Sequence, residues 1–162
     1  MNCEEEIIMT VGQILALVGA AIAVILSGMG SSKGVGLAGE TAAGVSSENP
    51  EVSSKLLVLQ LLPATQGIYG FLIGFLVLLK TPILGGDVTL TIAQGVQLFI
   101  ACLPIAIVGF FSAKLQGRVA CSAIGLLGKR GDSVGQGIVL TVMVETYAVL
   151  ALLASFLIQS GV

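Results

Sequence analysis

Four long apolar stretches dominate this chain of 162 residues and limit the folds that are open to it. They cover residues 7–32, 56–79, 88–113 and 133–162, and their only charged residue is Glu145. A helix of about 20 residues crosses the hydrocarbon core of a bilayer. Charged residues make up only 10% of the chain, against about 25% in globular domains. The sequence therefore predicts an all-α membrane protein with four transmembrane helices in a single membrane domain, 1–162.

Several classes of protein and site do not fit this sequence. Three acids, residues 4–6, precede the first stretch, whereas a secretory signal begins with basic residues, so we expect a span there and not a cleaved signal. The chain has three unpatterned cysteines and no histidine, which indicates neither a zinc nor a redox motif. Residues 34–39 match GxGxxG but follow an apolar helix instead of a strand. We expect no nucleotide, no nucleic acid and no catalytic site in this chain.

Three polar segments, at about residues 40–55, 80–87 and 128–136, separate the predicted helices. In the first, Asn49 is predicted to cap a helix whose first residue is Pro50. The middle segment carries only Lys80. The other basic residues flank or occupy the first and third segments: Lys33, Lys55, Lys114, Arg118, Lys129 and Arg130. Positive charge favours the cytoplasmic side, so both hairpin turns are predicted in the cytoplasm and both termini outside.

The two halves of the chain have the same layout. Two tandem helical hairpins, at about residues 9–80 and 88–161, place Gln66 and Glu145 at corresponding positions. Lys33 likewise corresponds to Arg118. Both hairpins would enter the membrane from the same side, so the repeat is parallel and not inverted.

Glu145 is the most informative single residue, because a carboxylate inside a membrane is costly and suggests a functional site. Gln66, Gln116 and Glu145 each lie 14 to 16 residues from a predicted cytoplasmic turn. With a rise of about 1.5 Å per residue, all three reach one level about 21–24 Å from the turns. Three different helices can therefore contribute to one polar site.

The second predicted helix adds further oxygen ligands. Leu62, Thr65, Gln66 and Tyr69 are three or four residues apart and share one side of that helix. Pro63 interrupts the hydrogen-bond ladder and makes nearby carbonyl oxygens available. One carboxylate with amide, hydroxyl and carbonyl oxygens suits a monovalent cation, since divalent cations usually recruit more carboxylates. This surplus of oxygens favours Na⁺ over H⁺.

Structural roles for the same residues remain open at this point. Glu145 could pair with an amide purely to hold two helices together, and Gln66 or Gln116 alone could form ordinary interhelical hydrogen bonds. Tyr69 could be a packing residue. In the first helix, small residues recur every four positions at Gly19, Ala23, Ser27 and Ser31, which predicts close helix packing.

Three runs of residues carry a family likeness. They are LQLLPATQGIYGF at 59–71, VMVETYA at 142–148 and SGMGSSKG at 27–34. These runs resemble the proteolipid subunits of V-type ATPases, most closely those of the bacterial sodium-transporting branch. The resemblance covers essentially the whole chain, and Ala64 replaces a glycine that is common in relatives.

The resemblance implies a homo-oligomeric rotor ring in a bacterial plasma membrane, with the first and third helices inside it. A stator membrane subunit with a basic residue, a central-stalk subunit at the cytoplasmic turns and a separate ATP-hydrolysing head would complete the machine. Each subunit would bind one Na⁺ in a site closed by a hydrogen bond from Tyr69. The implied ligands are the Leu62 carbonyl, Thr65, Gln66, Gln116 and Glu145.

Three alternatives compete with a sodium-carrying rotor. One is an H⁺-coupled rotor ring of the same family, because a proton site needs only the acid and a neighbour. Another is a small secondary transporter, although such proteins usually show inverted repeats or broken helices. The third is a structural or pore-forming ring.

Overall fold

The computed structural model describes residues 9–84 and 89–161, and all regular structure within those ranges is helical. Four helical segments are long and apolar enough to cross a membrane, which confirms the predicted all-α fold with four spans. The second span is interrupted, so it contains two α-helices. The α-helices are α1 (Val11–Glu48), α2 (Ser53–Leu61), α3 (Thr65–Leu78), α4 (Ile92–Lys129) and α5 (Val134–Ser160), and the 3₁₀ turns are η1 (Pro50–Val52), η2 (Leu62–Ala64) and η3 (Pro82–Leu84).

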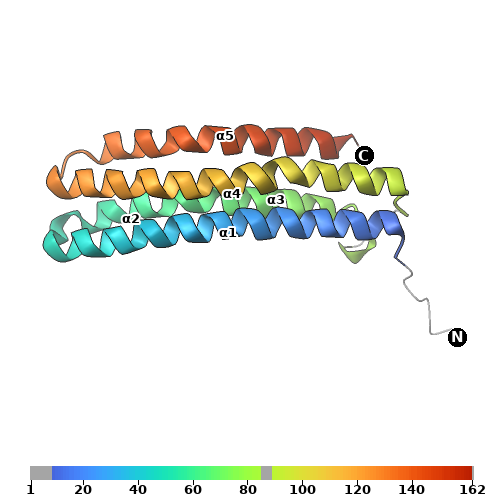
Figure 1. Ribbon diagram of the computed structural model, residues 1–162, viewed down its shortest axis with the longest axis horizontal. Helices are drawn as coiled ribbons and strands as arrows, with labels where there is room; N and C mark the ends of the chain where they lie inside the picture. Colours follow the sequence, from blue (N-terminus) through green and yellow to red (C-terminus); the bar gives the residue numbers. More distant parts are fainter. Residues whose placement is uncertain (1–8, 85–88, 162) are drawn as a thin grey trace, which may run out of the picture.

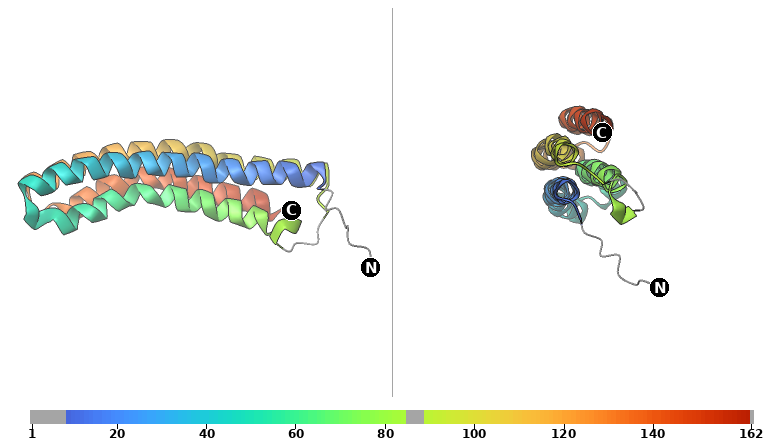
Figure 2. Two further views of the ribbon diagram at one scale, coloured as in Figure 1. Left: turned by 90° about the horizontal axis from the view of Figure 1, so that it is seen from below. Right: turned by 90° about the vertical axis from the view of Figure 1, so that its right-hand side faces the viewer.

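The four spans lie side by side along a common axis and form an elongated bundle. Both hairpin turns, α1 to α2 and α4 to α5, lie at one end of the bundle in Figure 1. The two hairpins therefore run in the same direction, as a parallel repeat requires. Helix α4 packs against α1 and α5, and α3 lies beside α1 and α4, as the end-on view of Figure 2 shows.

Matching caps begin the first helix of each hairpin. Thr10 and Thr91 each accept a hydrogen bond from the backbone N–H three residues later, at Gln13 and Gln94. The side chains of these glutamines reach back to the backbone N–H groups of the threonines, which completes a capping box. The predicted starts of these spans, residues 7 and 88, lie outside the described residues, and the limits of the two repeats stay a prediction.

Helices α1 and α4 approach so closely that backbone meets backbone. A Cβ atom added to Gly19 would lie 2.8 Å from the Cα of Phe99, and one added to Gly30 would lie 2.6 Å from the Cα of Phe110. A Cβ at Gly117 would overlap the backbone of Gly34. The predicted small-residue stripe is buried in this packing, which joins the first spans of the two hairpins within one chain.

Two of the predicted polar segments are largely helical. Helix α1 continues to Glu48, well beyond the end of its apolar stretch, and the third segment shrinks to the turn at residues 130–133. The reason is that Ala38 and Ala42 of α1 still share a buried core cluster with Ala120 and Leu127 of α4. The fall in hydropathy after residue 32 therefore shows where α1 becomes more polar, and not where the helix ends.

The turn of the first hairpin begins where the sequence predicts, with a different partner for its cap residue. A 3₁₀ turn starts at Pro50, but the side chain of Asn49 makes no capping hydrogen bond to it. The amide nitrogen of Asn49 instead donates to the carbonyl oxygen of Gly128 over 3.5 Å. Asn49 therefore connects the turn of the first hairpin to the end of α4, just before the turn of the second.

Candidate ion-binding site

The interrupted second span forms one wall of the candidate site. The 3₁₀ turn η2 separates α2 from α3 at Pro63, where the sequence predicts a distorted ladder. The carbonyl oxygen of Leu62 accepts a hydrogen bond of 3.0 Å from the hydroxyl of Thr65. Ser31 of α1 bridges the last residue of this turn and the start of α3, since its hydroxyl accepts from the N–H of Gly67 at 2.8 Å and donates to the carbonyl of Ala64 at 3.4 Å.

Polar side chains from α3, α4 and α5 meet at the level of this break. Gln66 and Gln116 are completely buried. The amide nitrogen of Gln66 donates to Oε1 of Gln116, and the amide nitrogen of Gln116 donates to Oε2 of Glu145 at 3.3 Å. The hydroxyl of Tyr69 donates to Oε1 of Glu145 at 2.6 Å. The structure thus brings together the polar residues that the sequence places at one level.

The hydroxyl of Thr65 has two acceptor oxygens within reach. Its hydroxyl lies 3.0 Å from the Leu62 carbonyl oxygen and 3.4 Å from Oε1 of Gln66, but it has only one hydrogen to donate. At any moment one of those two oxygens lacks the Thr65 hydrogen. Such spare lone pairs next to a carboxylate make a site that can bind a cation.

The single carboxylate distinguishes this site from a divalent-metal centre. Among residues 9–84 and 89–161, no group of three or more acidic, histidine or cysteine side chains is placed to hold a metal. In that same part of the chain, no lysine or arginine pairs with Glu145. Only neutral groups donate hydrogen bonds to Glu145 there. Its single negative charge is therefore not balanced, and one monovalent cation could balance it.

Two residues beside Glu145 stand apart from the site. Tyr147 is 68% exposed, and the hydroxyl of Thr146 donates within its own helix to the carbonyl of Met143. Two serines that the sequence reasoning missed do contact the site, Ser31 at the helix break and Ser112 beside Gln66. Ser112 comes four residues before Gln116, so helical spacing was the signal that could have revealed it.

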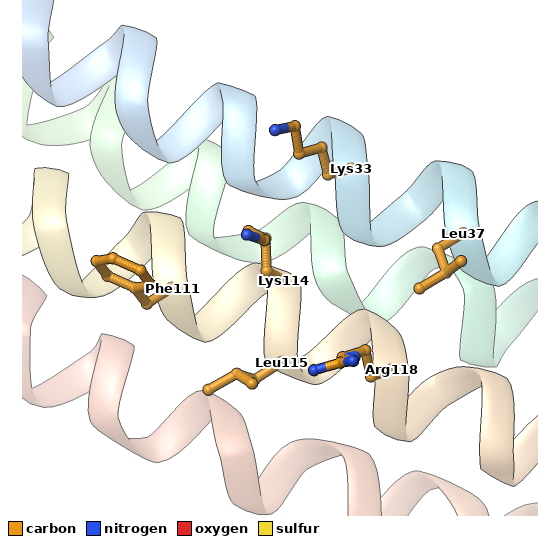
Figure 3. A pocket seen from close by; sticks show the side chains of 6 residues that line it. All are labelled: Lys33, Leu37, Phe111, Lys114, Leu115 and Arg118. Carbon is orange, nitrogen blue, oxygen red and sulfur yellow. The ribbon is translucent and has the colours of Figure 1, made fainter.

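A second polar feature lies on the surface of α1 and α4. Lys33, Lys114 and Arg118 line a pocket of about 400 Å³ together with Leu37, Phe111 and Leu115, as Figure 3 shows. The ammonium groups of Lys33 and Lys114 lie 5.9 Å and 5.2 Å from the ring centre of Phe110. Three cations repel a metal ion, so this pocket does not compete with Glu145 for one. The nearby GxGxxG run is part of α1 and forms no phosphate-binding loop.

Comparison with known proteins identifies the family of the chain. The family model that describes the C subunit of ATP synthase matches the chain twice, over residues 18–77 and 99–158. The first match contains Gln66, and the second contains both Gln116 and Glu145. The two matches confirm that the chain consists of tandem copies of one helical unit.

Two relatives are similar to this chain over nearly its whole length. One is the V-type sodium ATPase subunit K of Enterococcus hirae, 45% identical over 147 residues, which are 91% of each chain. The other is the A-type ATP synthase subunit K of Methanocaldococcus jannaschii, 36% identical over 149 residues. That alignment covers 92% of this chain and 63% of the relative.

These relatives are proteolipid subunits, the non-catalytic membrane components of rotary ATPases, which confirms the predicted resemblance. The four spans and the membrane ATPase relatives make this chain a multi-pass membrane protein. The double match and the two relatives show that the chain belongs to the ATP synthase C (proteolipid) family.

Proposed function

We propose that this chain is the ion-carrying subunit of the rotor ring of a V-type ATPase that transports Na⁺. The observation that carries the proposal is the chain of hydrogen bonds that links the single carboxylate of Glu145 through Gln116 and Gln66 to the acceptor oxygens around Thr65. The sodium ATPase named among the relatives supports the choice of ion. The ion is the transported substrate, and ATP hydrolysis takes place in a separate soluble head.

The proposed Na⁺ ligands come from both hairpins. They are the Leu62 carbonyl oxygen, the Thr65 hydroxyl, and the side-chain oxygens of Gln66, Gln116 and Glu145. In this structure the oxygen of Gln116 accepts from Gln66, and its nitrogen faces Glu145. We therefore expect the amide of Gln116 to turn when Na⁺ enters. Tyr69 closes the site through its hydrogen bond to Glu145.

Charge neutralisation explains how such a protein moves an ion. A bare carboxylate facing lipid is costly, whereas Na⁺ bound to Glu145 leaves no net charge at the site. The loaded protomer can then pass through the lipid as the ring turns. At the stator, a basic side chain of the stator membrane subunit replaces Na⁺ as the partner of Glu145, and the ion leaves.

The surface of the protein supports a ring embedded in lipid. Helix α5 exposes a row of large side chains, each at least 60% accessible: Val139, Met143, Tyr147, Leu150 and Leu157. An apolar surface of this extent requires lipid or another protein against it. In the proposed ring α1 and α4 face inward, and α2, α3 and α5 face outward toward the lipid and the stator.

The proposed orientation follows the basic residues. The hairpin turns lie in the cytoplasm of a bacterial cell, where they meet a central-stalk subunit, and both termini lie outside. Only the second hairpin carries an acid at the level of the candidate site, since Gln66 occupies the corresponding position in the first. One Na⁺ therefore crosses for every four helices of the ring, which suits a pump working against a steep gradient.

A carbodiimide that attacks protonated carboxyl groups tests the proposal. The protein, purified in its ring form, is labelled at mildly acidic pH with and without Na⁺, and the modified residue is mapped by mass spectrometry. We expect Glu145 to react and millimolar Na⁺ to protect it. The variant Glu145→Gln, which keeps the shape of the side chain, is the control and should show no labelling at this position.

The other outcomes identify the alternatives. Equal labelling of Glu145 with and without Na⁺ would favour an H⁺-coupled rotor. No labelling of Glu145 would contradict its role as ion carrier. Copurification of a large ring with a soluble ATPase head supports the rotor, whereas a small oligomer that exchanges a solute by itself would identify a secondary transporter.

A further inference from the structure

Ser112 of α4 touches two elements of the candidate site and lies outside the predicted ligand set. We propose that Ser112 is a positioning residue, which holds the side-chain amide of Gln66 with its oxygen directed toward Thr65 and the ion. This inference rests on the proposed function, because it concerns the affinity of the same site for Na⁺. It is carried by the directions of four hydrogen bonds around two buried amides.

The direction of the Ser112 hydroxyl is fixed by the backbone of α5. Ser112 is only 5% exposed, and its Oγ donates to the carbonyl oxygen of Val144 over 3.1 Å. A serine hydroxyl has one hydrogen, so Oγ can only accept from its other neighbour. That neighbour is the amide nitrogen of Gln66, at 3.4 Å. Ser112 thus presents a lone pair to Gln66.

A second acceptor faces the same amide nitrogen. Gln116 donates its own nitrogen to Oε2 of Glu145 at 3.3 Å, and this leaves its Oε1 directed at the nitrogen of Gln66. Both hydrogens of the Gln66 amide therefore have an acceptor. A Gln66 amide turned by 180° would place its oxygen against the oxygens of Ser112 and Gln116, with no hydrogen between them.

Because both hydrogens of the Gln66 amide point toward Ser112 and Gln116, its oxygen lies on the opposite side. Its Oε1 is directed toward the hydroxyl of Thr65, 3.4 Å away, on the side where the Leu62 carbonyl also lies. A cation needs oxygen there and is repelled by an NH₂ group. Without an ion, Ser112 contributes one of the two contacts that keep the oxygen in this place, and it is the contact that stays when Gln116 turns toward Na⁺. Ser112 also ties the backbone next to Glu145 to α4.

The test is the substitution Ser112→Ala in the full chain, purified in its ring form. The measured quantity is the Na⁺ concentration that halves carbodiimide labelling of Glu145. Loss of the Ser112 contact should raise this concentration about five- to tenfold, which corresponds to the loss of one buried hydrogen bond. Ser112→Thr retains a hydroxyl and should restore protection close to that of the unmodified chain.

A buried serine elsewhere provides the matched control. Ser27 is completely buried, and its hydroxyl donates to the carbonyl of Ile105 at 3.0 Å, but none of its hydrogen bonds reaches Gln66. Ser27→Ala should lower the thermal stability of the protein and leave the half-protecting Na⁺ concentration unchanged. A purely structural role for Ser112 would give the same result as Ser27→Ala, and that result would overturn the inference.

The experiment also separates this inference from the proposed function. If Na⁺ protects Glu145 in the unmodified chain and equally well in Ser112→Ala, the positioning role is wrong and the sodium site stands. If Na⁺ fails to protect Glu145 in the unmodified chain, both proposals are wrong.

Discussion

The hydroxyl of Tyr69 lies 2.6 Å from Oε1 of Glu145, so one hydrogen bond joins the second span to the fourth across the candidate site. Tyr69 is half-buried in α3, and Glu145 is half-buried in α5. A hydrogen bond to a carboxylate is stronger than one between neutral groups. This contact therefore holds the carboxylate of Glu145 in place from the side of the second span.

Tyr69→Phe should weaken Na⁺ binding and speed Na⁺ release. The substitution removes the hydroxyl and keeps the ring, and a hydrogen bond to a charged group contributes about 1.5–3 kcal/mol, or roughly ten- to hundredfold in affinity. The measurement is the release of radioactive sodium from the purified protein. Tyr147→Phe is the control. Tyr147 lies two residues after Glu145 and is 68% exposed, so its substitution should leave Na⁺ binding and release unchanged.

Gln66→Glu should create a second reactive carboxyl group. A carboxylate cannot supply the hydrogens that Gln66 donates to Gln116 and Ser112, and its charge would lie close to that of Glu145. We expect the introduced carboxyl to retain a proton at mildly acidic pH and react with a carbodiimide. Peptide mapping should then find labels at positions 66 and 145; a label at 145 alone would contradict this expectation.

Ser31→Ala should destabilise the interrupted span. Its hydroxyl contacts the N–H of Gly67 and the carbonyl of Ala64, two backbone groups on the far side of the Pro63 break. Loss of hydrogen bonds to these part-buried backbone groups should cost about 0.5–1.5 kcal/mol for each bond, which thermal unfolding in detergent can detect. Ser32→Ala is the control, since exposed Ser32 bonds only to Met29 in its own helix. Equal melting temperatures for the two variants would refute the bridging role.

Gly117→Ala should disturb the contact between α1 and α4. An added Cβ would overlap the backbone of Gly34, and overpacking of this kind typically costs about 1–3 kcal/mol. Gly125→Ala in the same helix has open space around the new methyl and should be neutral or slightly stabilising. Yield of intact rings and melting temperature measure the difference, and similar values for both variants would argue against backbone contact at Gly117.

The level of the candidate site could be predicted from sequence because an α-helix has a fixed rise. Counting residues from the turns placed Gln66, Gln116 and Glu145 together, and in the structure they form one hydrogen-bonded chain. A distortion at Pro63 was predictable because proline lacks an N–H, but whether it breaks the helix was not, since Pro104 lies inside the continuous helix α4.

The ends of the helices and the supporting contacts could not be predicted in this way. Helix α1 extends to Glu48 because alanines beyond the apolar stretch still pack against α4, and hydropathy contains no record of that packing. Ser31 and Ser112 look like ordinary small residues in an apolar helix. Their importance depends on which backbone groups other helices bring within reach, and that is decided only by tertiary structure.

The length of α1 has a mechanical consequence. Its 38 residues contain no proline and form one uninterrupted helix, about 57 Å long at 1.5 Å per residue. The hydrocarbon core is about 30 Å thick, so α1 reaches far beyond it toward the hairpin turn. If the chain works in a rotor as proposed, torque applied at that turn can be transmitted along α1, because no proline or 3₁₀ turn interrupts this helix. We expect the neighbouring span to bend more easily, because the 3₁₀ turn at Pro63 interrupts its helix at the level of the carboxylate.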